Sequence, residues 1–189
     1  MTRLIALALL LAPLPAFAHS GEVHLQGFVV GLLHPVSGLD HILAMLAVGL
    51  WAGLLGGRAA WLLPAGFLGG MAAGGAFGIA GIGLPMVEAG ILASVIVLGA
   101  LVAASARVRL AIAVPLVAVF GLLHGHAHGA ELATGIGAAG YAFGFLAATA
   151  ALHAIGVLGA LTASDATSRN VVRAAGGAMV ALLLVARLG

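Results

Sequence analysis

Six apolar stretches follow one another along almost the whole chain, separated by turns too short to form a soluble domain. They run roughly over residues 27–56, 61–81, 85–105, 110–130, 135–162 and 170–188. A helix needs about 20 mainly apolar residues to cross the hydrocarbon core of a bilayer, and each stretch is close to that length or longer. The sequence therefore predicts an all-α membrane protein whose single domain is a bundle of six transmembrane helices.

The scarcity of charge supports the same fold class. Only 6% of the residues are charged and 63% are hydrophobic, whereas a soluble domain usually has about 25% charged residues. The chain has no lysine and no basic cluster, so nucleic-acid binding is not expected and a P-loop, which needs its lysine, is excluded. It also has no cysteine, so metal ligands must be nitrogen, oxygen or the sulfur of methionine.

Residues 1–18 have the parts of a secretory signal peptide. Arg3 supplies the positive start, the apolar run at residues 4–11 is too short to span a bilayer, and residues 16–18 give the A-x-A cleavage pattern. We therefore expect cleavage after this pattern, which leaves residues 19–189 as one six-helix domain with its N-terminus outside the cytoplasm. An uncleaved first membrane helix is the alternative.

The arginines predict the orientation independently. With the mature N-terminus outside, the three inner loops carry five arginines and only one arginine falls on the outer side. The inner ones are Arg58, Arg107, Arg109, Arg169 and Arg173, and the outer one is Arg187. This distribution follows the positive-inside rule. We expect a multi-pass protein of a bacterial-type inner membrane with a periplasmic N-terminus.

Three carboxylates fall in the outer half of the predicted bundle or at its mouth, namely Asp40, Glu88 and Glu131. An ionisable residue in a membrane segment costs about 2.5–3.5 kcal/mol on insertion scales and normally faces a partner or a water-filled cavity. Apart from Arg187, the arginines lie at the other side, so the chain offers these carboxylates almost no internal cation. Either they are protonated or their partner comes from outside, as a metal dication would.

Seven of the eight histidines, all but His153, are expected on or near the outer side. Neutral imidazole is the commonest protein metal ligand. His124, His128 and Glu131 have the i, i+4, i+7 spacing that places three side chains on one helix face, unless the glycines between them break the helix. His126 points to the opposite side, and we expect it at the surface or the mouth.

A second group of candidates lies in the run His34-Pro35-Val36-Ser37-Gly38-Leu39-Asp40-His41. Proline removes a backbone donor and suits the first turn of a helix, so residues 34–38 are interpreted as a break. Asp40 and His41 then lie in the first turn of the main helix, near the positive end of its dipole, and His34 belongs to the preceding shorter segment. Broken helices at membrane depth line cavities and often mark transport sites.

The remaining candidates have plainer alternatives. His153 is either a relay ligand or a residue that hydrogen-bonds one helix to another. His19 and His24 form either a weak collecting site, to which the amine of His19 adds a nitrogen, or unremarkable parts of a flexible end. Glu88 is either an outer ligand or an interfacial residue at a helix start.

The two histidine motifs resemble the signatures of the HupE/UreJ family of nickel transporters. The first run looks like the family's H-P-x-x-G-x-D-H, and His124-Gly125-His126-Ala127-His128-Gly129-Ala130-Glu131 looks like its H-G-x-A-H-G-x-E segment. His153 falls where a family histidine is expected in the fifth helix. The resemblance covers the whole chain and implies supply of nickel to hydrogenase or urease, with cobalt carried by some related members.

We therefore expect a secondary transporter or permease rather than an enzyme, with no prosthetic group. Its substrate would be a divalent metal, nickel by preference, with cobalt or zinc as the other candidates, because imidazole and carboxylate suit such ions better than magnesium or calcium. The expected ligands are His34, Asp40, His41, His124, His128, Glu131 and His153, with His19, His24, Glu88 and His126 as weaker candidates. Protons compete for imidazole, so uptake should weaken below roughly pH 6.5.

Three other functions stay open at this point. An intramembrane zinc-dependent hydrolase would need about three ligands and one open position on its metal, whereas the candidates here are spread over several helices. A purely structural or sensory membrane protein with a metal-stabilised bundle is the second alternative, and a sensor would normally need an output domain. A proton channel would conduct without added metal. The sequence determines neither the oligomeric state nor the energy source, and it does not rank nickel against cobalt or zinc.

Overall fold

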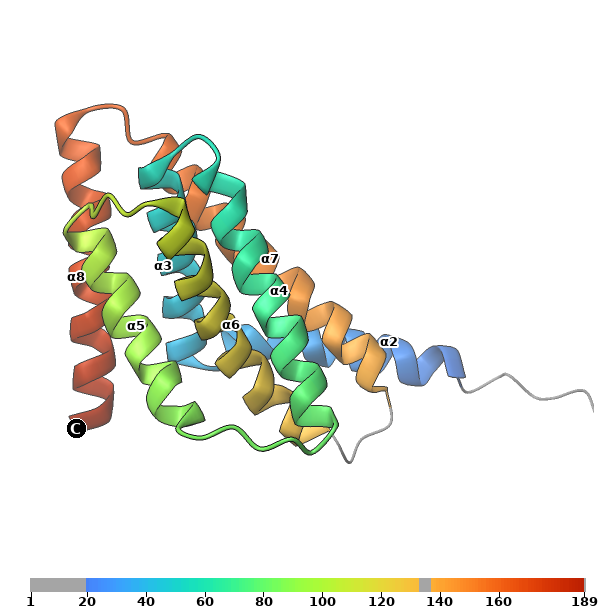
Figure 1. Cartoon of the computed structure of the whole chain (residues 1–189). Helices are drawn as coiled ribbons and strands as arrows, with labels where there is room; N and C mark the ends of the chain where they lie inside the picture. The colour runs from blue at the N-terminus through green and yellow to red at the C-terminus, as the bar shows by residue number, and fades with distance from the viewer. Residues whose placement is uncertain (1–19, 133–136, 189) are drawn as a thin grey trace, which may run out of the picture.

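Seven α-helices and one 3-10 turn form the part of the chain that the computed structural model describes, residues 20–132 and 137–188 (Figure 1). The side chains of residues 20–25, 131, 132 and 188 are not described. The elements are α2 (Ser20–Leu33), η2 (His34–Val36), α3 (Leu39–Leu55), α4 (Ala59–Ile79), α5 (Val87–Ala103), α6 (Leu110–Leu132), α7 (Ala138–Leu161) and α8 (Ala166–Leu188). These ranges contain no strand, and the all-α prediction is confirmed. The predicted signal peptide lies outside the described residues.

Four helices, α4, α6, α7 and α8, are long and apolar enough to cross a membrane. A fifth span is formed if α2 and α3 are taken together as one broken span, with a bend of 79° between residues 26–36 and 39–55. The chain is thus a multi-pass helical membrane protein, but the predicted set of six spans is not confirmed.

The missing span is α5, which has only 17 residues, fewer than the about 20 needed. Left-handed backbone at Met86 (φ 56°) and Ser105 (φ 47°) ends the helix at both sides, because an α-helix of L-residues cannot continue through that conformation. The apolar stretch at 85–105 gave no sign of these two turns.

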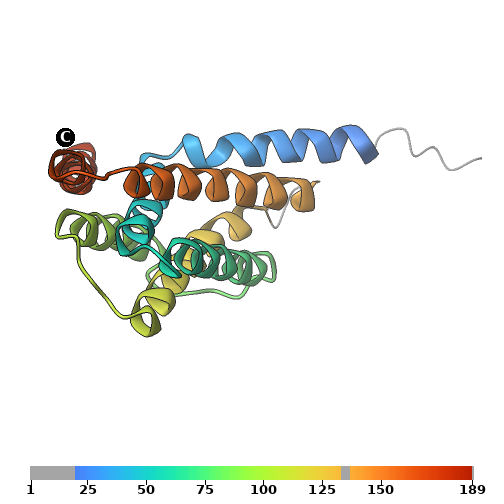
Figure 2. The ribbon, with the colours of Figure 1, turned by 90° about the horizontal axis from the view of Figure 1, so that it is seen from above.

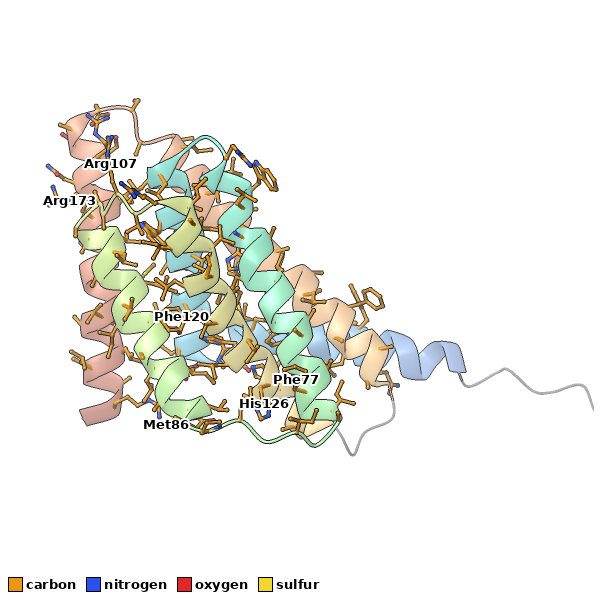
Figure 3. The ribbon with its side chains drawn as sticks, in the orientation of Figure 1. Phe77, Met86, Arg107, Phe120, His126 and Arg173 are labelled. Atoms are coloured by element: carbon orange, nitrogen blue, oxygen red, sulfur yellow. The ribbon has the colours of Figure 1, made fainter. Side chains whose placement is uncertain are left out.

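From α3 onward the helices run alternately up and down (Figure 1). The α3–α4, α5–α6 and α7–α8 connections lie together at one end of the bundle, where Figure 3 labels Arg107 and Arg173. We call this the arginine end. The break between α2 and α3, the α4–α5 turn and the C-terminal turn of α8 lie at the opposite end, which we call the site end. The grouping of arginines expected from the sequence is therefore present in the fold.

The most extensive contacts pair α4 with α6, α3 with α7, and α5 with α8, while α2 lies along α7 (Figure 2). Glycine makes the α4–α6 contact possible. A Cβ on Gly74 would collide with the carbonyl oxygen of Leu122, and one on Gly125 with that of Met71. Small residues let helix backbones approach closely in lipid. The contact places the side chains of Phe67 and Met71 beside the histidines of α6.

The surface away from these contacts is apolar. Phe143 is 69% exposed, Leu158 61% and Ile112 60%. In water such large apolar side chains would mostly be buried, so these outward faces suit contact with lipid. The interior of the bundle is filled by large buried side chains such as Trp51 and Leu63.

Candidate metal site

The break between α2 and α3 sets the position of the first histidine motif. Pro35 is buried in η2, and Ser37 closes the turn by donating its backbone N–H and its hydroxyl to the carbonyl oxygen of His34, at 3.0 and 2.7 Å. Gly38 is extended, and a Cβ on it would lie only 2.9 Å from Nδ1 of His41. The break predicted at residues 34–38 is confirmed, and its glycine leaves room for the side chains that follow.

Asp40 and His41 form a coupled pair in the first turn of α3. Oδ1 of Asp40 accepts the backbone N–H of His41 at 2.9 Å and lies 2.7 Å from Nδ1 of the same residue. Because an ionised carboxylate only accepts hydrogen bonds, the ring hydrogen of His41 lies on Nδ1, and Nε2 carries the lone pair. Metal-binding histidines are usually held in this way, with the other ring nitrogen donating to a carboxylate. Exposed fractions of 12% for the His41 side chain and 17% for that of Asp40 place the pair at the edge of the bundle.

The two motifs, far apart in the sequence, meet in one cluster. Nε2 of His41 lies 2.6 Å from Nε2 of His128, and the ring centroids of His41 and His124 are 4.8 Å apart. The rings of His34 and His128 stand edge to face at 4.6 Å. We call these four histidines and Asp40 the histidine cluster. Since α6 runs unbroken to Leu132, its glycines do not interrupt the helical spacing on which the prediction depended.

Ser94 on α5 holds His124 in one orientation. The Ser94 hydroxyl donates to the carbonyl oxygen of Ile91 at 2.6 Å, so at 2.9 Å its oxygen accepts the Nε2–H of His124. The lone pair of His124 is then on Nδ1, which is buried and has no hydrogen-bond partner within residues 26–130 and 137–187. A buried unsatisfied polar atom costs about 1–3 kcal/mol, and a cation would satisfy it. Sequence reasoning missed Ser94, whose only signal is a polar residue within an apolar stretch.

His153 lies closer to the arginine end than the histidine cluster does. Its Nδ1–H donates to the carbonyl oxygen of Met45 at 2.8 Å, which ties α7 to α3. Nε2 then carries the lone pair, and it too lacks a hydrogen-bond partner in the described part of the chain. The ring of Phe67 lies between the two levels, with centroids 5.5 Å from His124 and 5.1 Å from His153. The helix-to-helix hydrogen bond expected as one alternative is present, and it leaves the second nitrogen available.

Arg187 supplies a cation to the cluster. The Arg187 side chain is 52% exposed, and its guanidinium donates to Oδ2 of Asp40 at 3.2 Å. A cavity of about 280 Å³ opens at this contact and is lined by residues of α3 and α8. The expectation that the carboxylates have almost no internal cation is therefore wrong for Asp40. The two residues are 147 positions apart, and only the packing of α8 against the start of α3 brings them together.

The weaker candidates have other roles or lie outside the described residues. His126 is only 8% exposed and donates its Nε2–H to the carbonyl oxygen of Ile82 at 2.8 Å, beneath the α4–α5 turn (Figure 3). Of the two expected positions, surface or mouth, the surface is wrong because that turn folds over the side chain, and His126 lies at the site end. Glu88 is exposed in the first turn of α5. The side chains of Glu131 and His24, and the whole of His19, are not described, so their roles stay predictions.

No group of three or more His, Asp or Glu side chains within residues 26–130 and 137–187 surrounds one point as a closed metal site would. His41 instead joins Asp40 on one side to both His128 and His124 on the other, and His153 lies beyond His124 across the ring of Phe67. Conduction of an ion requires several sites, each weak enough to release it. The described donors are thus spread over several points of the bundle.

Comparison with known proteins shows the family of this chain. The family described as HupE / UreJ protein matches residues 7–186, which include both histidine motifs and His153. Protein HupE of Rhizobium leguminosarum bv. viciae is 49% identical over 178 residues, which cover 94% of this chain and 91% of that protein. No solved structure matches the chain.

Proposed function

This chain belongs to the HupE/UreJ family, and on that premise we propose that it is a secondary transporter or permease for a divalent transition metal. Nickel is the preferred substrate, with cobalt or zinc as alternatives, and the metal supplies hydrogenase or urease assembly. The observation that carries the proposal is the histidine cluster, in which a break in a membrane helix and a second helix bring four imidazoles to one carboxylate.

The metal enters from the site end. Asp40 provides negative charge at the edge of the bundle, and Nε2 of His41 provides a lone pair that faces His128. A metal bound between these two rings would replace the hydrogen bond that now joins them. Glu131, one turn beyond His128 in the sequence of α6, would add a second carboxylate and help to neutralise the dication. His19 and His24 would collect metal before this step.

The proposed orientation follows from the arginines. The arginine end faces the cytoplasm and the site end faces the periplasm of a bacterial-type inner membrane, after removal of residues 1–18. The mature chain of residues 19–189 then works as one domain. Metal moves from Asp40 toward His153, in the direction of the arginine end, which is the direction required for supply to enzymes in the cytoplasm.

A zinc-dependent intramembrane hydrolase fits the geometry less well. A catalytic zinc is held by about three protein ligands at one point and keeps an open position for water. Here three imidazoles meet around His41, and His153 lies apart from them on α7, bonded to the backbone of α3. Such a spread of donors has a use in transport and none in hydrolysis at a single metal.

Radiolabelled nickel uptake tests the proposal. We would compare cells that express the wild type, Asp40→Asn and His41→Ala at matched membrane levels, with Asp165→Asn as the control for an exposed carboxylate at the arginine end. We expect uptake in the wild type and the control, competition by cobalt, and collapse in the two cluster variants. Wild-type uptake equal to the empty-vector level, in correctly inserted protein, would remove the transport assignment.

A further inference from the structure

Two thioethers and a hydroxyl meet in the centre of the bundle. The hydroxyl of Thr149 on α7 donates to Sδ of Met45 on α3 at 3.4 Å, and lies 4.0 Å from Sδ of Met71 on α4. All three residues are at most 2% exposed. Three different helices therefore contribute one polarisable or polar atom each to a single buried point.

The orientation of Thr149 is unusual for a threonine in a helix. Such a hydroxyl commonly bonds to the carbonyl oxygen one turn back, as that of Thr162 does with Leu158 at 2.9 Å. Thr149 faces two sulfur atoms instead, which are weak acceptors. A fully buried hydroxyl with such partners still has lone pairs to offer, and the two sulfurs offer theirs beside it.

The thioethers lie between the histidine cluster and His153. Met71 lines the same cavity of about 220 Å³ as His128. On the other side, the backbone of Met45 holds His153 through its carbonyl oxygen, and Thr149 precedes His153 by one turn on the same face of α7. The ring of Phe67 offers no ligand atom, so an ion that leaves the cluster for His153 meets these sulfurs as the available donors.

We propose that Met45, Met71 and Thr149 form a thioether station, which receives the metal from the histidine cluster and passes it to Nε2 of His153. The inference rests on the proposed transport of a divalent transition metal and names a further site on its path. Thioethers are soft, neutral ligands, so they suit transition-metal ions better than magnesium or calcium, and a donor set without a carboxylate leaves the charge of a dication uncompensated. Weak binding is what an intermediate step of transport requires.

X-ray absorption spectroscopy gives a direct test because the chain has no cysteine. Any sulfur bound to nickel in the purified full-length protein must come from methionine. We expect a nickel–sulfur contribution in the wild type and its loss in the double variant Met45→Leu with Met71→Leu. Met179→Leu is the matched control, since Met179 is a buried methionine on α8, away from the path, and it should keep the contribution.

Uptake kinetics give the second test. Leucine conserves the volume of methionine and usually keeps a core intact. We expect the double variant to lower the maximal rate of nickel uptake on the order of tenfold with little change in the half-saturating concentration, because the station acts after capture. Met179→Leu should match the wild type.

Different results would contradict the thioether station and the transport function on which it rests. An unchanged maximal rate in the double variant, with nickel bound to nitrogen and oxygen alone, would overturn the thioether station. Transport itself would still stand if Asp40→Asn abolished uptake in the same cells. Absence of wild-type uptake would remove both the station and the function on which it rests.

Discussion

Asp40 interacts with two residues, and a metal bound at its carboxylate would compete with one of them. Its Oδ1 orients His41 and its Oδ2 accepts a hydrogen bond from Arg187. Without a bound metal, the guanidinium neutralises the carboxylate. This lowers the free-energy cost of burying Asp40 at the edge of the membrane. A dication at the same carboxylate would be repelled by Arg187, and the half-exposed arginine has the cavity beside it into which it can turn.

We therefore predict that Arg187→Gln lowers the half-saturating nickel concentration. An exposed ion pair contributes about 0.2–1 kcal/mol, so the gain in apparent affinity should be roughly 1.5- to 5-fold. Initial rates of nickel uptake over a range of concentrations would measure it, with Arg187→Lys as the control that keeps the charge. A higher half-saturating concentration in Arg187→Gln would show that the arginine positions Asp40 for binding and does not compete with the metal.

The helices hold the site together through backbone contacts at glycine. Glycine recurs at every fourth position on both helices of one pair and faces the opposite backbone there, at Gly70, Gly74 and Gly78 on α4 and at Gly121, Gly125 and Gly129 on α6. In a sequence, such stripes of small residues indicate only that each helix packs closely against another helix. The structure shows which helices they join, and that the contact fixes the separation between the ligands of α6 and the core side chains of α4.

Gly125→Leu should unfold or rearrange this pair, because its side chain would meet the backbone of Met71. Overpacking of a core costs typically about 1–3 kcal/mol and more when backbone must move. We expect a lower melting temperature in detergent and loss of nickel binding. Gly69→Leu is the control, since nothing lies within 4 Å of a Cβ at that position on α4. Equal melting temperatures for the two variants would contradict the role of the contact.

The start of α8 carries a charge-dependent cap. The carboxylate of Asp165 accepts the backbone N–H of Ser168 at 2.8 Å, and this bond holds the pKa of Asp165 below its ordinary value of 3.8. A lowered folded-state pKa gives stability that is present above pH 3.8 and is lost as the pH falls through the folded-state value.

We expect Asp165→Asn to melt at a lower temperature than the wild type at neutral pH, because asparagine keeps an acceptor oxygen but loses the charge at the helix start. The difference should shrink once the pH drops below 3.8. Thermal melting of both proteins in detergent, followed at several pH values, measures this effect. A difference of constant size at all pH values would mean that the charge of Asp165 contributes nothing.

The two ends of the molecule carry different side chains, and this difference is already visible in the sequence. Five arginines lie at one end and the histidine cluster at the other. Local patterns were sufficient for the membrane fold, the break at residues 34–38 and the shared face of His124 and His128, because each depends on neighbours within a turn or two. The contacts of Asp40 with Arg187 and of His124 with Ser94 are tertiary, and no local pattern encodes them. The same holds for the turn that buries His126.

The orientation can be tested with single cysteines, since the chain has none. Gly83→Cys lies in the exposed α4–α5 turn at the site end, and Ser164→Cys lies in the exposed α7–α8 turn at the arginine end. We expect a membrane-impermeant maleimide to label Gly83→Cys in spheroplasts and to label Ser164→Cys only after the membrane is opened. The reverse pattern would invert the proposed direction of transport.

The most extensive contacts divide the bundle into three bodies, α4 with α6, α3 with α7 and α2, and α5 with α8. Asp40 and His41 belong to the second body, whereas His124 and His128 belong to the first. An ion bound in the histidine cluster would therefore link these two bodies to each other. If the proposed transport holds, the protein without metal would be the looser state, and the bound metal would tighten the contact between these bodies.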